Sequence, residues 1–149
     1  MPNSALRNAP LHRSFKAVEQ AFRQQFLLRM RQEHIDLFPG AAPLILHLGD
    51  EDGLTMSELG KRCGLESSTM TPLVDELERR KLIGRARDPE DRRVIRLHLT
   101  PAGRALEPRL RTLLLDLQAV AFCRIPDSDL AVMRSVLESI LANLGAHSD

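Results

Sequence analysis

The sequence is poor in aromatic residues and in cysteine. Among its 149 residues there is no Trp and no Tyr, and the aromatic side chains, all of them Phe, make up 3%. Any hydrophobic core must therefore be aliphatic, built mainly from leucine. The two cysteines, Cys63 and Cys123, are too few for a disulfide framework and fit a reducing compartment.

Long apolar runs and a strong net charge are missing as well. We find no run of about 18 apolar residues and no signal-peptide pattern, so we expect a soluble, cytoplasmic protein without a membrane partner. The formal net charge is only +1, so the chain is not a polycation. A surface for nucleic acid would have to come from the distribution of charge rather than from its total.

Apolar residues spaced three or four apart predict long helices at both ends of the chain. The stripe in 11–37 consists of Phe15, Val18, Phe22, Phe26 and Met30. Pro39 and Gly40 are expected to end that helix. The length predicts a single domain, 1–149, in which 11–37 and 104–144 are dimerisation helices. These helices are too apolar to coat one small lobe, so we expect them to pack against a second copy of the chain.

The middle section, 42–103, is expected to form a compact lobe that begins with short helices. After a helix at 42–50, Thr55 and Glu58 have the spacing of a capping box at the start of the next helix. Gly64 is well placed to end that helix in a left-handed conformation. Ser67 or Ser68 is then expected to cap a longer helix, running to about residue 81.

Two strands and a turn complete the lobe. Gly84 is expected to break the preceding helix, and Ile83–Arg87 and 94–99 predict strands joined by a loop at 88–93. Thr100 and Pro101 then have the pattern of an N-cap and first position of a new helix. The fold class is therefore mostly α with a small β-wing. It is a winged helix-turn-helix with N- and C-terminal dimerisation helices, and this fold reads DNA.

The chemistry that could bind DNA is concentrated around this wing. Between Arg79 and Arg96 there are eight positive and three negative residues, and seven of the eight are Arg. Arg suits phosphate and base-edge geometry, although a charge run can also be an ordinary solvated face. Short hydroxyl side chains at the start of the preceding helix could contact bases and phosphates, although Ser67 could equally serve as an N-cap. The residues expected at the DNA interface are Ser67, Ser68, Thr69, Thr71, Pro72, Arg85, Arg87, Arg92 and Arg93.

The adjacent arginines of the wing loop, Arg92 and Arg93, cannot both point the same way on an extended backbone. We expect one of them to pair with Asp88 or Asp91 and to stiffen the loop. The other would reach outward, where a narrow minor groove attracts Arg. The alternative is that both form ordinary surface ion pairs of little energetic value.

Residues 40–107 resemble the MarR family of transcriptional regulators. The motifs that carry the resemblance are Leu-Thr-x-x-Glu-Leu, Ser-Ser-Thr-Met-Thr-x-Leu-Val-x-x-Leu-Glu-Arg-Arg, Asp-Pro-Glu-Asp-Arg-Arg and Leu-Thr-Pro-Ala-Gly. The resemblance implies a homodimer with two winged lobes on a pseudo-palindromic operator in double-stranded DNA. It also implies an effector pocket between the dimerisation helices and each lobe. On DNA, the resemblance implies that Arg93 enters the minor groove and that residues 67–71 enter the major groove.

Residues that the chain lacks argue against peroxide sensing and metal sensing. Thr71-Pro72-Leu73 resembles the hydroperoxide-sensing branch of the family, but that branch uses an early cysteine with tyrosine partners. This chain has neither, so we expect Cys63 and Cys123 to serve in packing. The five histidines have no close ligand spacing, so no metal and no cofactor are expected. A small-molecule effector remains, and the candidate pocket residues are Phe15, Phe22, Arg23, His34 and His47.

The sequence thus favours a repressor that a small-molecule effector releases from DNA. The alternative is a ligand-independent activator or an architectural DNA-binding protein. An enzyme is disfavoured because no catalytic triad, metal-ligand set or phosphate loop is present. A winged helix used only for protein contact is disfavoured by the paired arginines of the wing.

Overall fold

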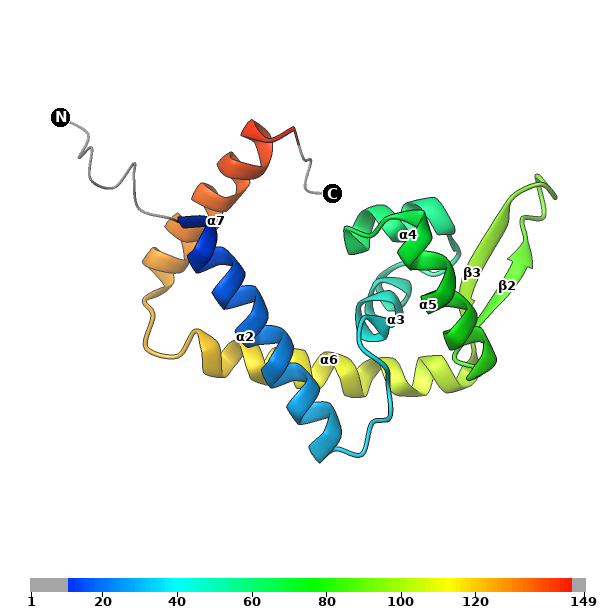
Figure 1. The fold of residues 1–149 in the computed structure, drawn as a ribbon, viewed down its shortest axis with the longest axis horizontal. Coiled ribbons are helices and arrows are strands. Elements are labelled where there is room, and N and C mark those ends of the chain that lie inside the picture. Colours follow the sequence, from blue (N-terminus) through cyan, green and yellow to red (C-terminus); the bar gives the residue numbers. More distant parts are fainter. Residues whose placement is uncertain (1–10, 146–149) are drawn as a thin grey trace.

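The computed structural model describes residues 11–145, and its helices and strands follow the expected order. The helices are α2 (Leu11–Gln32), α3 (Ala41–Asp50), α4 (Met56–Cys63), α5 (Ser67–Arg79), α6 (Pro101–Ala121) and α7 (Asp127–Asn143). The strands are β1 (Leu54–Thr55), β2 (Ile83–Arg87) and β3 (Ile95–Leu99). In Figure 1, α6 runs along the base of the molecule, with the lobe over one end and α2 crossing the other.

The sheet is antiparallel, with strand order β1-β3-β2. The central strand β3 pairs Leu97 with Leu54 of β1 and with Arg85 of β2. The two-residue strand β1 was not expected from the sequence. It fixes the end of the turn after α3 to the base of the wing, and the β2–β3 hairpin projects from the lobe beyond it (Figure 1).

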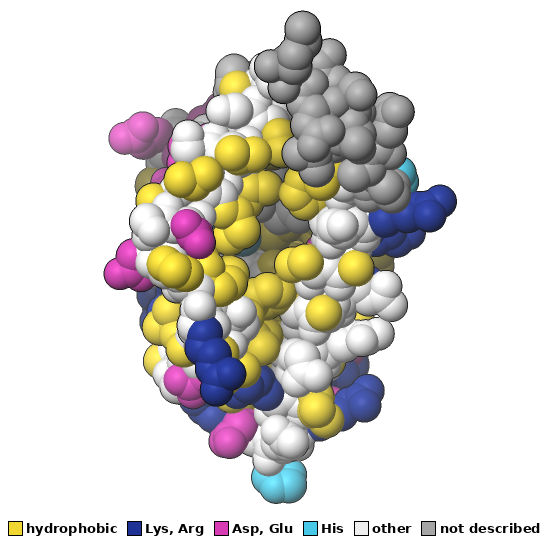
Figure 2. All heavy atoms as spheres, turned by 90° about the vertical axis from the view of Figure 1, so that its left-hand side faces the viewer, with side chains coloured by type: hydrophobic (Ala, Val, Ile, Leu, Met, Phe, Trp, Pro, Cys, Tyr) yellow, Lys and Arg dark blue, Asp and Glu magenta, His cyan; other side chains and the backbone are white. Residues whose placement is uncertain are grey.

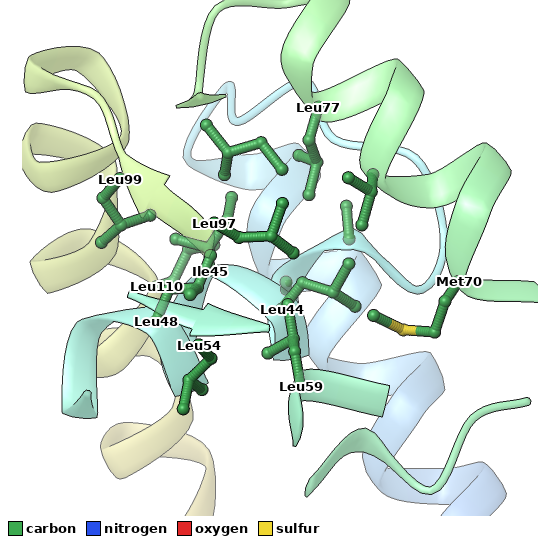
Figure 3. Close-up of a cluster of buried hydrophobic side chains, with 14 of the residues drawn as sticks. Leu44, Ile45, Leu48, Leu54, Leu59, Met70, Leu77, Leu97, Leu99 and Leu110 are labelled. Carbon is green, nitrogen blue, oxygen red and sulfur yellow. The ribbon is translucent and has the colours of Figure 1, made fainter. Parts of the chain in front are cut away.

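The core of the lobe is aliphatic, as the composition predicts. Its fully buried side chains come from α3, α4, α5, the sheet and α6, and those of largest volume are Leu44, Ile45, Leu48, Leu59, Met70, Leu77, Ile83, Leu97, Leu110 and Val74. Figure 3 labels most of these side chains, which converge between the helices and the sheet. No Phe is among the buried core residues of the described chain. Because all of these buried side chains belong to one chain, the lobe has a complete core without a partner.

Several helix ends match the sequence prediction. Thr55 and Glu58 form the reciprocal capping box of α4, and Gly64 ends that helix at φ 63°. Thr100 caps α6 by accepting a hydrogen bond from the backbone N–H of Gly103, with Pro101 at the first position. These signals are local, so they can be recognised from the sequence alone.

Two helix ends differ from the prediction, and the same motif explains both. Helix α2 ends at Gln32, before Pro39 and Gly40, because His34 turns left-handed at φ 53° and Ile35 N–H donates to Met30 O at 2.8 Å. This is a Schellman turn, sealed by two buried apolar side chains.

Helix α5 ends in the same way. Lys81 is left-handed at φ 59° and Leu82 N–H donates to Leu77 O at 2.9 Å. Gly84 does not break the helix, but lies in β2 opposite His98. In both turns a non-glycine residue takes the left-handed position, so the sequence carries no glycine signal there.

The terminal helices are left largely uncovered. Met30 is the buried residue of α2, and α7 has none. The exposed large hydrophobic side chains on and around α2, α6 and α7 are Leu11, Phe15, Val18, Leu28, Leu115, Val120, Ile125, Val132, Met133, Val136, Leu137, Leu141 and Leu144. Figure 2 shows hydrophobic side chains gathered on this side of the molecule. Among the described residues, no helix combines the length and hydropathy needed to cross a membrane.

Candidate nucleic-acid interface and adjoining cavity

The start of α5 presents its hydroxyl side chains to solvent. Ser67, Ser68, Thr69 and Thr71 are all exposed, as is Pro72. The expectation that Ser67 or Ser68 caps the helix is wrong, because the N-cap residue is Glu66 and no side chain caps the helix. The Thr71 hydroxyl donates to Ser67 O at 3.1 Å, within the same turn. The serine hydroxyls and the first N–H groups of α5 are therefore not used in capping and could meet an anionic ligand.

The wing loop is stiffened by two carboxylates that hold its backbone. Asp88 accepts hydrogen bonds from the N–H groups of Glu90 at 2.8 Å and Asp91 at 3.1 Å, and it also pairs with the Arg96 guanidinium. Arg96, followed by the two backbone N–H groups, lowers the pKa of Asp88 to about 2. The Asp91 carboxylate accepts from Arg93 N–H at 3.0 Å. The loop is thus held by its acids while its basic side chains extend away.

The expectation that Arg92 or Arg93 pairs with one of these acids is therefore wrong. Both acids are satisfied by backbone N–H groups, and Asp88 takes its ion pair from Arg96 on β3 instead. Arg92 and Arg93 are exposed, and within 11–145 neither side chain forms an ion pair. Two uncompensated guanidinium groups therefore stand at the wing.

The two arginines of β2 have different surroundings. Arg85 donates to Asp75 at 2.6 Å and also pairs with Glu78, so its charge is compensated by α5. Within 11–145, Arg87 forms no ion pair and donates one long hydrogen bond of 3.4 Å, to the carbonyl of Arg92, and its side chain is exposed. Arg85 thus fastens the wing to α5, whereas Arg87 adds to the free positive charge beside the loop.

A cavity of about 460 Å³ lies between the lobe and the terminal helices. Its lining comes from α2, the segment before α3, α3 itself and α6, namely Glu19, Phe22, Arg23, Phe26, Leu27, Met30, Phe38, Gly40, Ala42, Pro43, Leu46, His47, Asp50, Arg111, Leu114 and Leu117. Most of these side chains are apolar. A mainly apolar cavity with a few polar groups is typical of a small-molecule site.

Three of the five residues expected at an effector pocket line this cavity, and two do not. Phe22, Arg23 and His47 are part of the wall. Phe15 lies exposed on α2 outside it, and His34 is the left-handed residue that ends α2. The sequence did not indicate Phe38 or Arg111, which reach the cavity from distant segments. Arg111 is held there by Asp50 at 2.7 Å and Glu107 at 2.5 Å.

The two cysteines are free thiols in different surroundings. Burial raises the pKa of the Cys63 thiol to about 11, and the side chain packs against the lobe core as expected. A thiol with a raised pKa is a poor nucleophile near neutral pH. Cys123 is exposed, so the packing expected for it does not occur within one chain. Within 11–145 no three potential metal ligands cluster, and His147 lies outside the described residues.

Comparison with known proteins shows what the fold is similar to. Residues 36–94, from the segment before α3 to the end of the wing loop, match the model described as the MarR family. A MarR-family regulator from Silicibacter pomeroyi superposes with a TM-score of 0.75 at 25% identity, covering 91% of this chain and 90% of that one. The middle of the chain thus matches the MarR family, and the whole fold is similar to that of a MarR-family regulator.

Two further proteins extend the comparison. CouR from Rhodococcus jostii RHA1, solved bound to p-coumaroyl-CoA, gives a TM-score of 0.75 at 26% identity over 89% of this chain and 92% of its own. The Bacillus subtilis HTH-type transcriptional regulator YsmB is 32% identical over 93 residues, 62% of each chain. The chain spans less than two thirds of the length of the first curated relatives it matches. The relatives named here are transcriptional regulators, not enzymes.

Proposed function

We propose that the chain is a sequence-specific DNA-binding transcriptional regulator. The observation that carries this proposal is the combination of an exposed, uncapped start of α5 with free arginines on a stiff wing. A helix start of this kind fits the major groove, and exposed Arg fits a narrow minor groove. Ser67, Ser68, Thr69, Thr71 and Pro72 would face the major groove, and Arg92 and Arg93 the minor groove, with Arg87 near the phosphates.

The proposed active form is a homodimer. Helix α7 buries none of its residues within one chain, and its apolar side chains join those of α2 and α6 on one side of the molecule (Figure 2). A second copy of the chain would cover this surface symmetrically. Two lobes would then face two half-sites of a pseudo-palindromic operator in double-stranded DNA.

The proposed signal is a small molecule that enters the cavity and releases the DNA, so that the protein acts as a repressor. The cavity is large enough for such a ligand, and CouR, which shares this fold, was solved with p-coumaroyl-CoA. Arg23 could bind an anionic end of the ligand while Phe22 and Leu117 contact its apolar part. A ligand-independent activator or architectural protein is the second candidate, but it leaves the cavity without a role.

Selection from a random library of DNA duplexes tests the proposal. The full chain should enrich one pseudo-palindromic sequence and bind it more tightly than a scrambled duplex, with an affinity that falls steeply as salt rises. Failure to enrich any sequence, or binding that ignores salt, would reject sequence-specific recognition by this surface. A reporter promoter carrying the selected site then separates a repressor from an activator.

A further inference from the structure

The segment between α2 and α3 lies between the cavity and α5. Phe38 and Gly40 of this segment line the cavity. On its other side the segment meets α5, because a side chain added at Gly40 would lie 3.5 Å from the Leu73 methyl groups. This segment, the wall between the cavity and α5, would thus contact both a ligand in the cavity and the proposed reading helix.

Arg80 joins the end of α5 to this wall through two contacts, and a third contact holds its side chain on α5. Its guanidinium carbon lies 5.4 Å from the centre of the Phe38 ring, within the range of a cation–π interaction. One guanidinium nitrogen donates to Asp36 O at 2.9 Å, and another donates to Glu76 on α5 at 2.7 Å. The Arg80 side chain is largely covered, with 27% of its surface exposed.

The neighbouring Arg79 shows that this arrangement is specific to one position. Arg79 also pairs with Glu76, at 2.6 Å, but its side chain is 70% exposed. No contact between Arg79 and residues 36–40 is found within the described part of the chain. Both arginines can therefore stabilise the end of α5, but only Arg80 joins it to the cavity wall.

We infer that Arg80 is a positioning residue that transmits occupancy of the cavity to α5. A ligand that displaces the Phe38 ring moves the surface on which the Arg80 guanidinium lies and the carbonyl to which it donates. Because α5 is one continuous helix from Ser67 to Arg79, a shift at Arg80 reorients the hydroxyl residues at its other end. This inference rests on the proposed function, since it assumes that the cavity takes a small molecule and that α5 reads DNA.

The amphipathic aromatic anion 8-anilinonaphthalene-1-sulfonate is a suitable probe, because its rings match the apolar wall and its sulfonate matches Arg23. Two methionine methyl groups report the two ends of the path by NMR. Met30 lines the cavity, and Met70 is buried on α5 away from it. In the parent protein, the probe should shift both methyl signals and weaken binding to the selected duplex by roughly 5-fold or more, a typical size for allosteric coupling.

In Arg80→Ala, the probe should still shift the Met30 signal, but the Met70 shift and the effect on DNA affinity should disappear. Arg79→Ala, the matched control, should behave like the parent. If Arg80→Ala does not fold, Phe38→Leu offers a second variant, because it keeps an apolar side chain in the wall and removes the aromatic face under Arg80. Phe38→Leu should likewise lose the Met70 shift.

The inference is overturned if Arg80→Ala keeps the Met70 shift and the parent's DNA response. It is also overturned if the probe moves Met30 but not Met70 in the parent, or does not move Met30 at all. Failure of the parent to bind any DNA would instead count against the proposed function. The two methyl signals would still decide whether Arg80 couples the cavity to α5.

Discussion

The winged lobe and the terminal helices bury their apolar side chains to very different extents. In the lobe, Leu44, Leu48 and Leu59 are completely buried, whereas on α7 Val132 is 63% exposed and Val136 is 51% exposed. The lobe therefore has a core of its own, while α7 buries none of its residues within one chain. This difference supports the two proposed roles, in which the lobe would recognise DNA and the terminal helices would join two lobes.

The largest expected effect is on the core of the lobe. Leu44→Ala should lower the free energy of unfolding by about 2–5 kcal/mol, because the side chain is fully buried and its loss leaves a cavity. Leu137→Ala on α7 is the matched comparison, since Leu137 is 39% exposed within one chain. Its effect should depend on protein concentration, because it acts through association. Chemical denaturation at several concentrations measures both, and a silent Leu44→Ala would contradict the assignment of the core.

The next effect concerns the wing. Arg93→Ala should weaken binding to the selected duplex by about 1–3 kcal/mol, as expected when an arginine inserted into a groove is lost. Stability should not change, because Arg93 is exposed and forms no ion pair within the described residues. Arg79→Ala removes another exposed arginine and should have a smaller effect. Titration of labelled duplex, with thermal unfolding as a folding check, would reject the wing assignment if Arg93→Ala binds like the parent.

A smaller effect is expected at the start of α5. Thr69→Ala should reduce the ratio of affinities for selected and scrambled duplexes, because base contacts discriminate between sequences and phosphate contacts do not. Thr112→Ala is the control, since it also removes an exposed threonine hydroxyl, but from α6 rather than from the proposed reading helix. An unchanged ratio in Thr69→Ala would mean that Thr69 makes no base contact.

The smallest effect is the response of the wing loop to acid. The pKa of Asp88 is about 3.9 in the unfolded chain and is lowered to about 2 in the folded chain. The largest cause of this shift is the hydrogen bond from Arg96. A lowered pKa means that the carboxylate stabilises the loop above about pH 4 and that this contribution is lost as pH falls through about 2. The amide signals of Glu90 and Asp91 should titrate with a midpoint near the lower value, and in Asp88→Asn this titration should vanish. A midpoint near 4 would show that the pair with Arg96 is not maintained.

The features that the sequence predicted are those set by neighbouring residues. The capping box at Thr55, the left-handed Gly64 and the Thr100-Pro101 helix start follow from local side-chain and backbone geometry. The ends of α2 and α5 were placed wrongly because His34 and Lys81 take left-handed conformations without being glycine. There the buried apolar contacts of the turn outweigh local preference.

The candidate site could be predicted from the sequence only in part, again because local motifs are visible in the sequence and contacts between distant residues are not. The hydroxyl residues of α5 and the arginines of the wing stand in short, recognisable motifs. The pairing of Arg85 with Asp75, ten residues away, and of Asp88 with Arg96 depends on how the strands pack. The contact of Arg80 with Phe38 joins residues separated by 42 positions. No periodicity in the sequence encodes such contacts.

The division of roles is tested most directly by counting chains on DNA. Sedimentation velocity should show the free chain as a dimer at micromolar concentration, and a complex of two chains on one selected duplex. Val136→Asp, which places a charge on the exposed face of α7, should yield monomers that no longer form this complex although the lobe stays folded. A folded parent monomer in solution, or a complex containing a single chain per duplex, would contradict the account.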